Sequence, residues 1–232
     1  MRLKCKIDCV FADGTKDCRA EKIKRTAYNL AEVLITIGII GVVAAITISG
    51  LIKKYQEYVL HNQLKRCYSV LSQTVTQLNY EYDGNWDINL SQVFDDITAK
   101  IKTVKLCKGK SGCFESAPIK YRGRSGHSGN WNANNRCKFV INTGEFVMIS
   151  KVEGLVSSDY GYTIKNPKFE LSIDINGMKR PNEYGKDVFE FGIRDGILVP
   201  AGIDTKSESC KNRQGPGYDC AWMVLVEGKF PR

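Results

Sequence analysis

Cysteine is the residue type that most clearly indicates chemistry in this sequence. Nine cysteines occur in 232 residues. The later six suit an oxidising compartment, where cysteines pair in disulfides; unpaired thiols in a reducing compartment are the alternative. A zinc site is disfavoured, because the sequence has no Cys-x-x-Cys pair and only His61 and His127 could add nitrogen ligands. The early cysteines are Cys5, Cys9 and Cys18, and the later ones are Cys67, Cys107, Cys113, Cys137, Cys210 and Cys220.

Asp174, Asn176 and Asp187 are the candidate metal ligands of the sequence. Their side-chain oxygens could bind Ca²⁺, which prefers oxygen donors. Asp-x-Asn-Gly is also an ordinary composition for a hairpin turn, and the spacing is not that of an EF-hand. The turn is therefore the favoured interpretation, and no other cofactor is expected.

Nothing in the sequence is typical of a catalytic site. It has neither a nucleophile elbow nor a phosphate-binding loop, so we do not expect an enzyme. The formal net charge is +9, of which residues 28–232 carry +5, and surface solubility explains this modest excess as well as nucleic-acid binding does. The aromatic loop 121–131, with Arg122, Arg124 and His127, could contact nucleic acid or glycan, but a solvated loop is favoured.

A single acid, Glu32, interrupts a long apolar segment. Residues 30–52 otherwise hold only apolar, small or hydroxyl-bearing side chains, and Lys53 and Lys54 follow them. As a helix this segment is long enough to cross a hydrocarbon core of about 30 Å. Residues 1–27 carry eight Lys/Arg against four Asp/Glu, so we expect the N-terminal side to face the cytoplasm. A helix buried in a soluble core is the disfavoured alternative.

The helical pattern continues beyond the apolar segment. Apolar residues recur at three- and four-residue spacing over 53–83, which predicts an amphipathic half that buries one face. Asp83-Gly84-Asn85 is the first strong stop signal, so the sequence predicts one helix of about 50 residues. The apolar residues of this stripe are Tyr55, Val59, Leu64, Cys67, Leu71, Val75, Leu78 and Tyr82.

Residues 84–232 are expected to form a globular, β-rich head. A short helix is predicted over 90–104 and a loop over 123–135. Beyond this loop the apolar pattern has a period of two, which is typical of strands. Four to six antiparallel strands with one apolar face need a cover, which the amphipathic half of the long helix supplies, giving an α+β fold. The strands are predicted over 138–141, 145–152, 168–175, 187–193, 196–199 and 221–226.

The stretch Tyr28-Asn-Leu-Ala-Glu-Val-Leu-Ile35 resembles the processing and methylation signature of type IV prepilins and type II secretion pseudopilins. The stretches 174–189 and 217–222 resemble the heads of a bacterial group of such proteins. The resemblance implies a leader ending at Ala27, cleavage by a prepilin peptidase, N-methylation of Tyr28, and Glu32 as the acid needed for processing and assembly. Ala27 stands where most relatives have Gly, and Asn29 where they have Thr.

The resemblance also implies a function, an architecture and a location. The architecture is a pilin-like fold with a leader (1–27), a transmembrane half-helix (28–52), an amphipathic half-helix (53–83) and a head (84–232). The function is that of a structural subunit of a type IV pilus or a type II secretion-like filament. Its partners are related subunits, the peptidase, membrane lipid and an inner-membrane assembly platform. The chain would span the bacterial inner membrane once, with its head outside the cytoplasm, and reach the periplasm or cell surface after assembly.

An ionised carboxylate at bilayer depth costs several kcal/mol unless it finds a partner. Cleavage after Ala27 would create one, the α-amine of Tyr28 in the same or a neighbouring subunit. Burial of Glu32 then depends on the arrival of the next subunit in register. A stripe of small residues suits close helix packing, although ordinary membrane-helix composition explains it equally well. This stripe consists of Gly38, Gly41, Ala45 and Ser49.

Two cysteine pairs bracket short loops in the head. Cys210 and Cys220 enclose a Gly-Pro-Gly sequence and would close a surface loop like the C-terminal loop of many pilins, and Cys107 and Cys113 enclose another loop. These pairings would leave Cys67 and Cys137 to join helix and sheet, unless they are free packing thiols.

A second function class stays open. The chain could be an uncleaved signal-anchored protein whose head binds a ligand or performs chemistry outside the cytoplasm. Within the first class, secretion, adhesion, motility and DNA uptake are not distinguished by the sequence.

Overall fold

The structure is a computed structural model. It describes residues 8–12, 15–19, 29–109, 118–122, 127–128, 136–152, 164–177, 179–211 and 215–231, and only the backbone of 8–12, 15–19 and 127–128. The chain divides into two compact units, Met1–Ile52 and Lys53–Arg232.

The first unit contains a β-hairpin and the first part of a long helix. Strands β1 (Asp8–Ala12) and β2 (Thr15–Arg19) pair in antiparallel fashion, with Cys9 opposite Cys18. No element was expected here, although the intervening Asp-Gly is a strong signal for a two-residue hairpin. Helix α1 (Leu30–Glu81) has 52 residues, which agrees with the predicted length.

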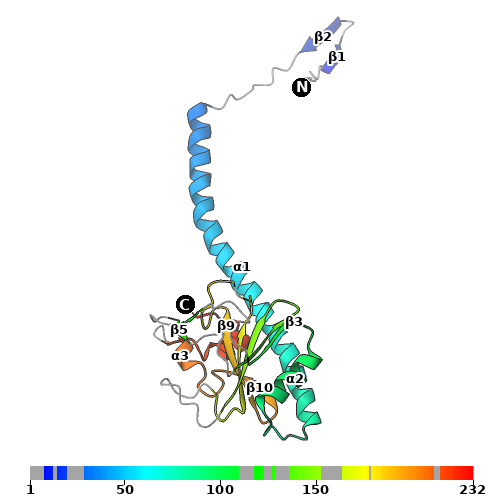
Figure 1. Cartoon of the computed structure of the whole chain (residues 1–232). Coiled ribbons are helices and arrows are strands. Elements are labelled where there is room, and N and C mark those ends of the chain that lie inside the picture. The colour runs from blue at the N-terminus through cyan, green and yellow to red at the C-terminus, as the bar shows by residue number, and fades with distance from the viewer. Residues whose placement is uncertain are drawn as a thin grey trace. The chain divides into compact units, whose positions relative to one another are not determined.

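The head is built on a six-stranded antiparallel sheet in the order β10-β9-β8-β7-β6-β3 (Figure 1). The predicted hairpins 138–152 and 187–199 are confirmed, and their turns are Asn142–Gly144 and Asp195–Gly196. Helix α2 (Leu90–Lys100) is capped by Asn89, whose side chain accepts a hydrogen bond from the Gln92 N–H at 2.8 Å. The strands are β3 (Thr103–Lys108), β6 (Cys137–Ile141), β7 (Phe146–Lys151), β8 (Phe169–Asp174), β9 (Val188–Arg194) and β10 (Ile197–Pro200).

Two parts of the head differ from the prediction. The end of the predicted helix 90–104 is the start of edge strand β3, where β-branched Thr103 and Val104 favour an extended backbone. The predicted strand 221–226 is helical: α4 (Cys220–Trp222) continues into the π-helical segment η1 (Met223–Glu227). A short apolar run fits a buried helix as well as a strand, and periodicity does not separate them.

Three short elements complete the described head. Strands β4 (Ile119–Lys120) and β5 (His127–Ser128) pair with each other, and α3 (Glu208–Lys211) precedes the C-terminal helical segment.

One face of the sheet packs against α2 and the part of α1 that belongs to the head. Leu64, Leu71 and Leu78 of α1 are fully buried together with Phe139, Phe169, Phe189 and Phe191 of the sheet. The predicted amphipathic stripe is therefore confirmed from Leu64 to Leu78. Burial of each such side chain contributes about 1.5–3 kcal/mol.

The side chain of Asn79, near the end of α1, lies close against Gly196 of the β9–β10 turn. Its Oδ1 accepts a hydrogen bond from Trp86 Nε1 at 2.8 Å. A Cβ at Gly196 would lie 1.9 Å from this oxygen, and Gly196 has a φ of +74°. Glycine is therefore required at position 196 by two constraints, backbone conformation and close approach.

Substitution of Gly196 should separate these two constraints when compared with Gly84. Gly84 also follows an Asp and has a φ of +76°, but a Cβ there meets nothing within 4 Å. We expect Gly196→Ala to lower the free energy of unfolding by about 2 kcal/mol more than Gly84→Ala, because only the former displaces Asn79. Urea unfolding followed by tryptophan fluorescence measures both. Equal losses would mean that Asn79 moves away without penalty.

Candidate functional sites: an exposed apolar helix and an oxygen-rich turn

The N-terminal part of α1 exposes its apolar side chains. By length and composition, α1 alone among the described helices could cross a membrane, and none of its most apolar stretch is buried in the chain. This indicates a membrane-anchored protein. The exposed large residues up to residue 52 are Leu30, Val33, Leu34, Ile35, Ile37, Ile39, Ile40, Val42, Val43, Ile46, Ile48, Leu51 and Ile52.

The hydroxyl groups in this stretch are satisfied within the helix. Thr36 Oγ1 donates to the carbonyl of Val33, Thr47 Oγ1 to that of Val43, and Ser49 Oγ to that of Ile46, at 2.9–3.0 Å. Such bonds remove the need for a polar partner outside the helix, which suits an apolar surrounding.

Glu32 lies in the first turn of α1 and closes a capping box with Asn29. The Asn29 N–H donates to Glu32 Oε2 at 3.2 Å, and the Ala31 N–H lies 3.5 Å from Asn29 Oδ1. The two side chains thus satisfy N–H groups at the start of the helix. The Asn-x-x-Glu spacing before an apolar run is the sequence signal for this capping box, which the sequence analysis above did not predict. Ala27 and Tyr28 lie outside the described residues.

The small residues predicted for helix packing face open space in this single chain. A Cβ at Gly38 or Gly41 would meet nothing within 4 Å, and Ala45 and Ser49 are exposed. Their role in packing stays a prediction.

Asp174, Asn176 and Asp187 come together in the turn between β8 and β9. Asp174 ends β8, opposite Val188 of β9, so Asp187 is adjacent to it. Asn176 Nδ2 donates to Asp187 Oδ2 at 3.1 Å, and the Asn176 N–H donates to Asp174 Oδ1 at 3.2 Å. Asp174 and Asp187 are 1 % and 0 % exposed, which is unusual for carboxylates that belong to no ion pair of the described residues.

Electrostatics in this turn disfavour two negative charges. Burial, followed by the neighbouring Asp187 carboxylate, raises the pKa of Asp174 to about 9. Burial also raises the pKa of Asp187, although the N–H groups of Glu183 and Asn182 and the Asn176 amide oppose this. No three His, Cys, Asp or Glu side chains of the described chain gather as metal ligands.

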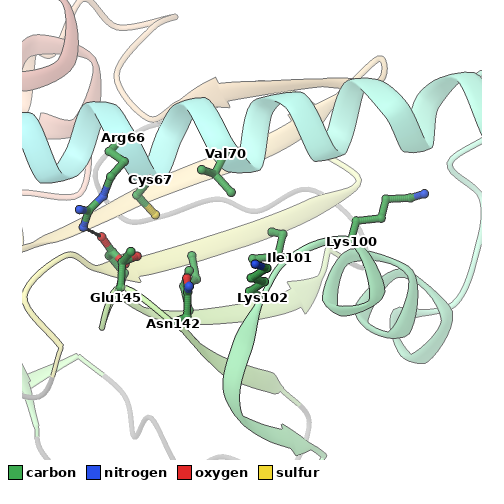
Figure 2. A pocket seen from close by; sticks show the side chains of 10 residues that line it. Arg66, Cys67, Val70, Lys100, Ile101, Lys102, Asn142 and Glu145 are labelled. Atoms are coloured by element: carbon green, nitrogen blue, oxygen red, sulfur yellow. Dashed lines mark hydrogen bonds and ion pairs between the residues drawn. The ribbon is translucent and has the colours of Figure 1, made fainter.

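A cavity of about 200 Å³ lies beside the part of α1 in the head (Figure 2). Its wall contains an ion pair between Arg66, which is half exposed, and Glu145, which is 1 % exposed. Thr143 Oγ1 also donates to Glu145. Arg66 thus compensates the buried negative charge of Glu145 at the β6–β7 turn. Removal of Arg66 would leave that charge without a partner. The lining residues are Arg66, Cys67, Val70, Lys100, Ile101, Lys102, Ile141, Asn142, Thr143 and Glu145.

The aromatic loop does not present Arg122 to solvent. Arg122 is 6 % exposed, and its Nη2 donates to the carbonyl of Cys210 at 2.6 Å. Tyr121 stacks on Tyr184, with ring centroids 6.4 Å apart. Arg124 and Trp131 lie outside the described residues. Arg122 is therefore neither available to nucleic acid or glycan nor solvated, as the favoured interpretation of the loop had it, because its guanidinium binds the C-terminal loop.

The structure contains one of the predicted cysteine pairs and corrects another. Cys210 and Cys220 form a disulfide with a Cα–Cα distance of 5.0 Å. Cys107 is disulfide-bonded, whereas Cys113 lies outside the described residues. The bond between Cys67 and Cys137 does not form: both are free, buried thiols, which confirms the alternative that the sequence left open. They pack as small apolar groups in the core shared by helix and sheet.

No protein-family model, no curated protein and no solved structure matches this chain.

The two free thiols should be unreactive in the folded chain. Burial raises the pKa of the Cys67 thiol, and the nearby Glu145 carboxylate raises it further, whereas Arg66 lowers it. Burial also raises the pKa of the Cys137 thiol. Because the thiolate is the reactive form, we expect alkylation by iodoacetamide about a hundredfold slower than after unfolding. Peptide mass mapping without reductant measures this.

The exposed Ser69 of α1 provides the matched control. The thiol of Ser69→Cys should be alkylated rapidly in the native protein. If Cys67 and Cys137 also resisted alkylation in guanidinium without reductant, they would be joined in a disulfide and the structure would be wrong on this point.

Proposed function

We propose that this chain is a structural subunit of a pilus-like or secretion-type filament, which assembles through the exposed apolar part of α1. The observation that carries the proposal is a continuous helix whose apolar side chains face outward up to residue 52, with one carboxylate in its first turn. The same helix then contributes buried residues to the head. A helix of this kind can leave the bilayer only if other helices cover it.

Glu32 combines two roles in this proposal. Its carboxylate caps the helix through the Asn29 N–H, and in a mature chain beginning at Tyr28 it would also lie about one helical turn from a positive α-amine. The capping bond needs only a hydrogen-bond acceptor, whereas the pairing with an amine needs the negative charge. These requirements can be separated by substitution.

The alternative is a signal-anchored protein that keeps its N-terminal residues. The capping box favours it, since local helix capping accounts for Glu32 without any processing or partner. In that case the apolar part of α1 serves only to hold the head at the membrane.

The mass of the N-terminal peptide distinguishes the two. For a filament subunit we expect a chain that begins with N-methylated Tyr28 in the membrane and filament fractions. Tandem mass spectrometry of the purified protein from its native host provides the measurement. An intact N-terminus at Met1 in all fractions would exclude processing at Tyr28 and favour the anchored protein.

Glu32→Gln tests the charge without loss of the cap, because Gln also accepts the bond from Asn29. We expect normal membrane insertion but an at least tenfold (about 1.4 kcal/mol) loss of incorporation into sheared filaments. Immunoblots of membrane and sheared fractions measure both quantities.

Asn29→Ala is the matched control, since it removes the capping side chain and keeps the charge. It should assemble nearly as the native chain does. If Asn29→Ala lost assembly and Glu32→Gln retained it, helix capping rather than charge pairing would be the function of Glu32.

A further inference from the structure

Two turns of the sheet lie beside residues 53–66 of α1. The β6–β7 turn reaches the helix through the ion pair between Glu145 and Arg66. The β8–β9 turn lies directly against the β6–β7 turn, since a Cβ at Gly177 would come within 2.8 Å of the Gly144 carbonyl oxygen. Both turns are therefore at one end of the head, which we call the helix-entry end because the part of α1 that belongs to the head begins there.

The C-terminal segment returns to the same part of α1. A Cβ at Gly228 would lie 3.2 Å from Cε1 of His61. His61 belongs to a face of α1 whose residues recur at three- and four-residue spacing and are therefore neighbours on the helix surface. This face consists of Lys54, Tyr58, His61 and Lys65. The C-terminal segment thus borders a helix face that carries two lysines and a tyrosine.

Four acidic side chains at the helix-entry end each have a basic partner. The pairs are Lys53–Glu57 at 4.0 Å, Lys186–Glu183 at 2.6 Å, Lys229–Glu227 at 3.3 Å, and Arg66–Glu145. Asp174 and Asp187 are buried below the surface, and burial raises the pKa of Asp174 to about 9, so this carboxyl group is uncharged near neutral pH. The acids of this end therefore do not compensate its other basic side chains.

Five further basic side chains of the helix-entry end are exposed and belong to no ion pair of the described residues. Lys102 is one of them, because it lines the same cavity as Arg66 (Figure 2). The other four come from α1 and from the β8–β9 turn. The five are Lys54, Lys65, Lys102, Lys179 and Arg180.

The opposite end of the head is balanced in charge. Lys168 precedes β8, whereas Asp174 ends it, so Lys168 lies a strand length away from the β8–β9 turn. Lys165 and Lys168 are exposed there, and so are Asp83 and Asp195. Excess positive charge therefore distinguishes the helix-entry end from the far end of the same sheet.

Exposed apolar and aromatic side chains accompany these charges. Tyr55 and Tyr58 of α1 are 66 % and 65 % exposed, and Val226 of the C-terminal segment is 62 % exposed. Tyrosine and lysine are typical of the membrane–water interface, because each has an apolar body and a polar tip. Lys53 directly follows the apolar stretch in the chain, so these residues are the first beyond it.

We propose that the helix-entry end binds the anionic headgroups of phospholipids, at the surface of the membrane that holds the apolar part of α1. Each basic side chain near an anionic membrane surface strengthens binding by about fivefold. The inference rests on membrane anchorage and applies equally to a filament subunit and to an uncleaved anchored protein. Lipid is favoured over nucleic acid or a second copy, because insertion of the apolar stretch keeps the adjoining residues at the membrane surface.

The test uses the full chain, inserted as one copy per nanodisc of either phosphatidylcholine alone or a mixture with about 30 % phosphatidylglycerol. Acetylation of lysines by acetic anhydride is followed by peptide mass spectrometry. We expect Lys65 and Lys179 to react about fivefold more slowly in the anionic discs, and about 0.5 M NaCl should abolish the difference by screening. Lys168 is the internal reference and should react equally in both discs.

Two outcomes would overturn the proposal. Equal protection of Lys65 and Lys179 in neutral and anionic discs would mean that the head contacts lipid without selecting its charge. Absence of protection in both discs would mean that the helix-entry end does not contact lipid at all. A single chain per disc cannot form a filament, so neither outcome bears on the proposed assembly.

A pair of double variants tests which end of the head is responsible. Lys179→Gln with Arg180→Gln should reduce the protection of Lys65 in anionic discs to within about twofold of the neutral discs. Lys165→Gln with Lys168→Gln removes the same charge from the opposite end and should leave that protection unchanged. All four side chains are exposed, so both variants should fold. Equal loss of protection in the two variants would mean that the net charge of the head, rather than this surface, attracts the lipid, and the proposal would fail.

Discussion

Exposure of the apolar side chains of α1 up to residue 52 is the constraint on which the rest of this protein depends. Each large apolar side chain left in water forgoes about 1.5–3 kcal/mol of burial free energy, and the chain itself covers none of the most apolar stretch. The surface must therefore be taken up by lipid or by other helices. Internally bonded hydroxyls and a capped first turn keep polar groups of the helix satisfied in such a surrounding.

The helix can perform this task because its continuation is held by the head. From Leu64 to Leu78, one face of α1 is buried against the six-stranded sheet, and Asn79 joins its end to the β9–β10 turn and Trp86. The later part of α1 is therefore covered by the head of the same chain, whereas its apolar first part must be covered by lipid or by other helices. Its composition changes accordingly, from apolar on all sides to apolar on one side.

The buried carboxylates of the head differ in whether they have a positively charged partner. Glu145 is offset by Arg66 from the helix and by a hydroxyl from its own turn. Asp174 and Asp187 have backbone and amide donors but no ion-pair partner in the described chain, and the amide oxygen of Asn176 beside them accepts no hydrogen bond there. The contrast sets the β8–β9 turn apart from the ordinary hairpin that its Asp-x-Asn-Gly sequence suggests, because a simple turn does not bury two adjacent carboxylates.

The sequence by itself determined the elements whose signals are local. The long helix, its amphipathic stripe and the hairpins at 142–144 and 195–196 follow from hydrophobic period and turn residues, which act between near neighbours. Only the tertiary structure decided the rest. The apolar run at 221–226 became helical, Cys67 and Cys137 stayed thiols, and Asp187 came to lie beside Asp174, because each outcome depends on how the chain packs in three dimensions. Local spacing carries no information about such distances, so the proximity of Asp174, Asn176 and Asp187 could be suspected from the sequence but was established only by the tertiary structure.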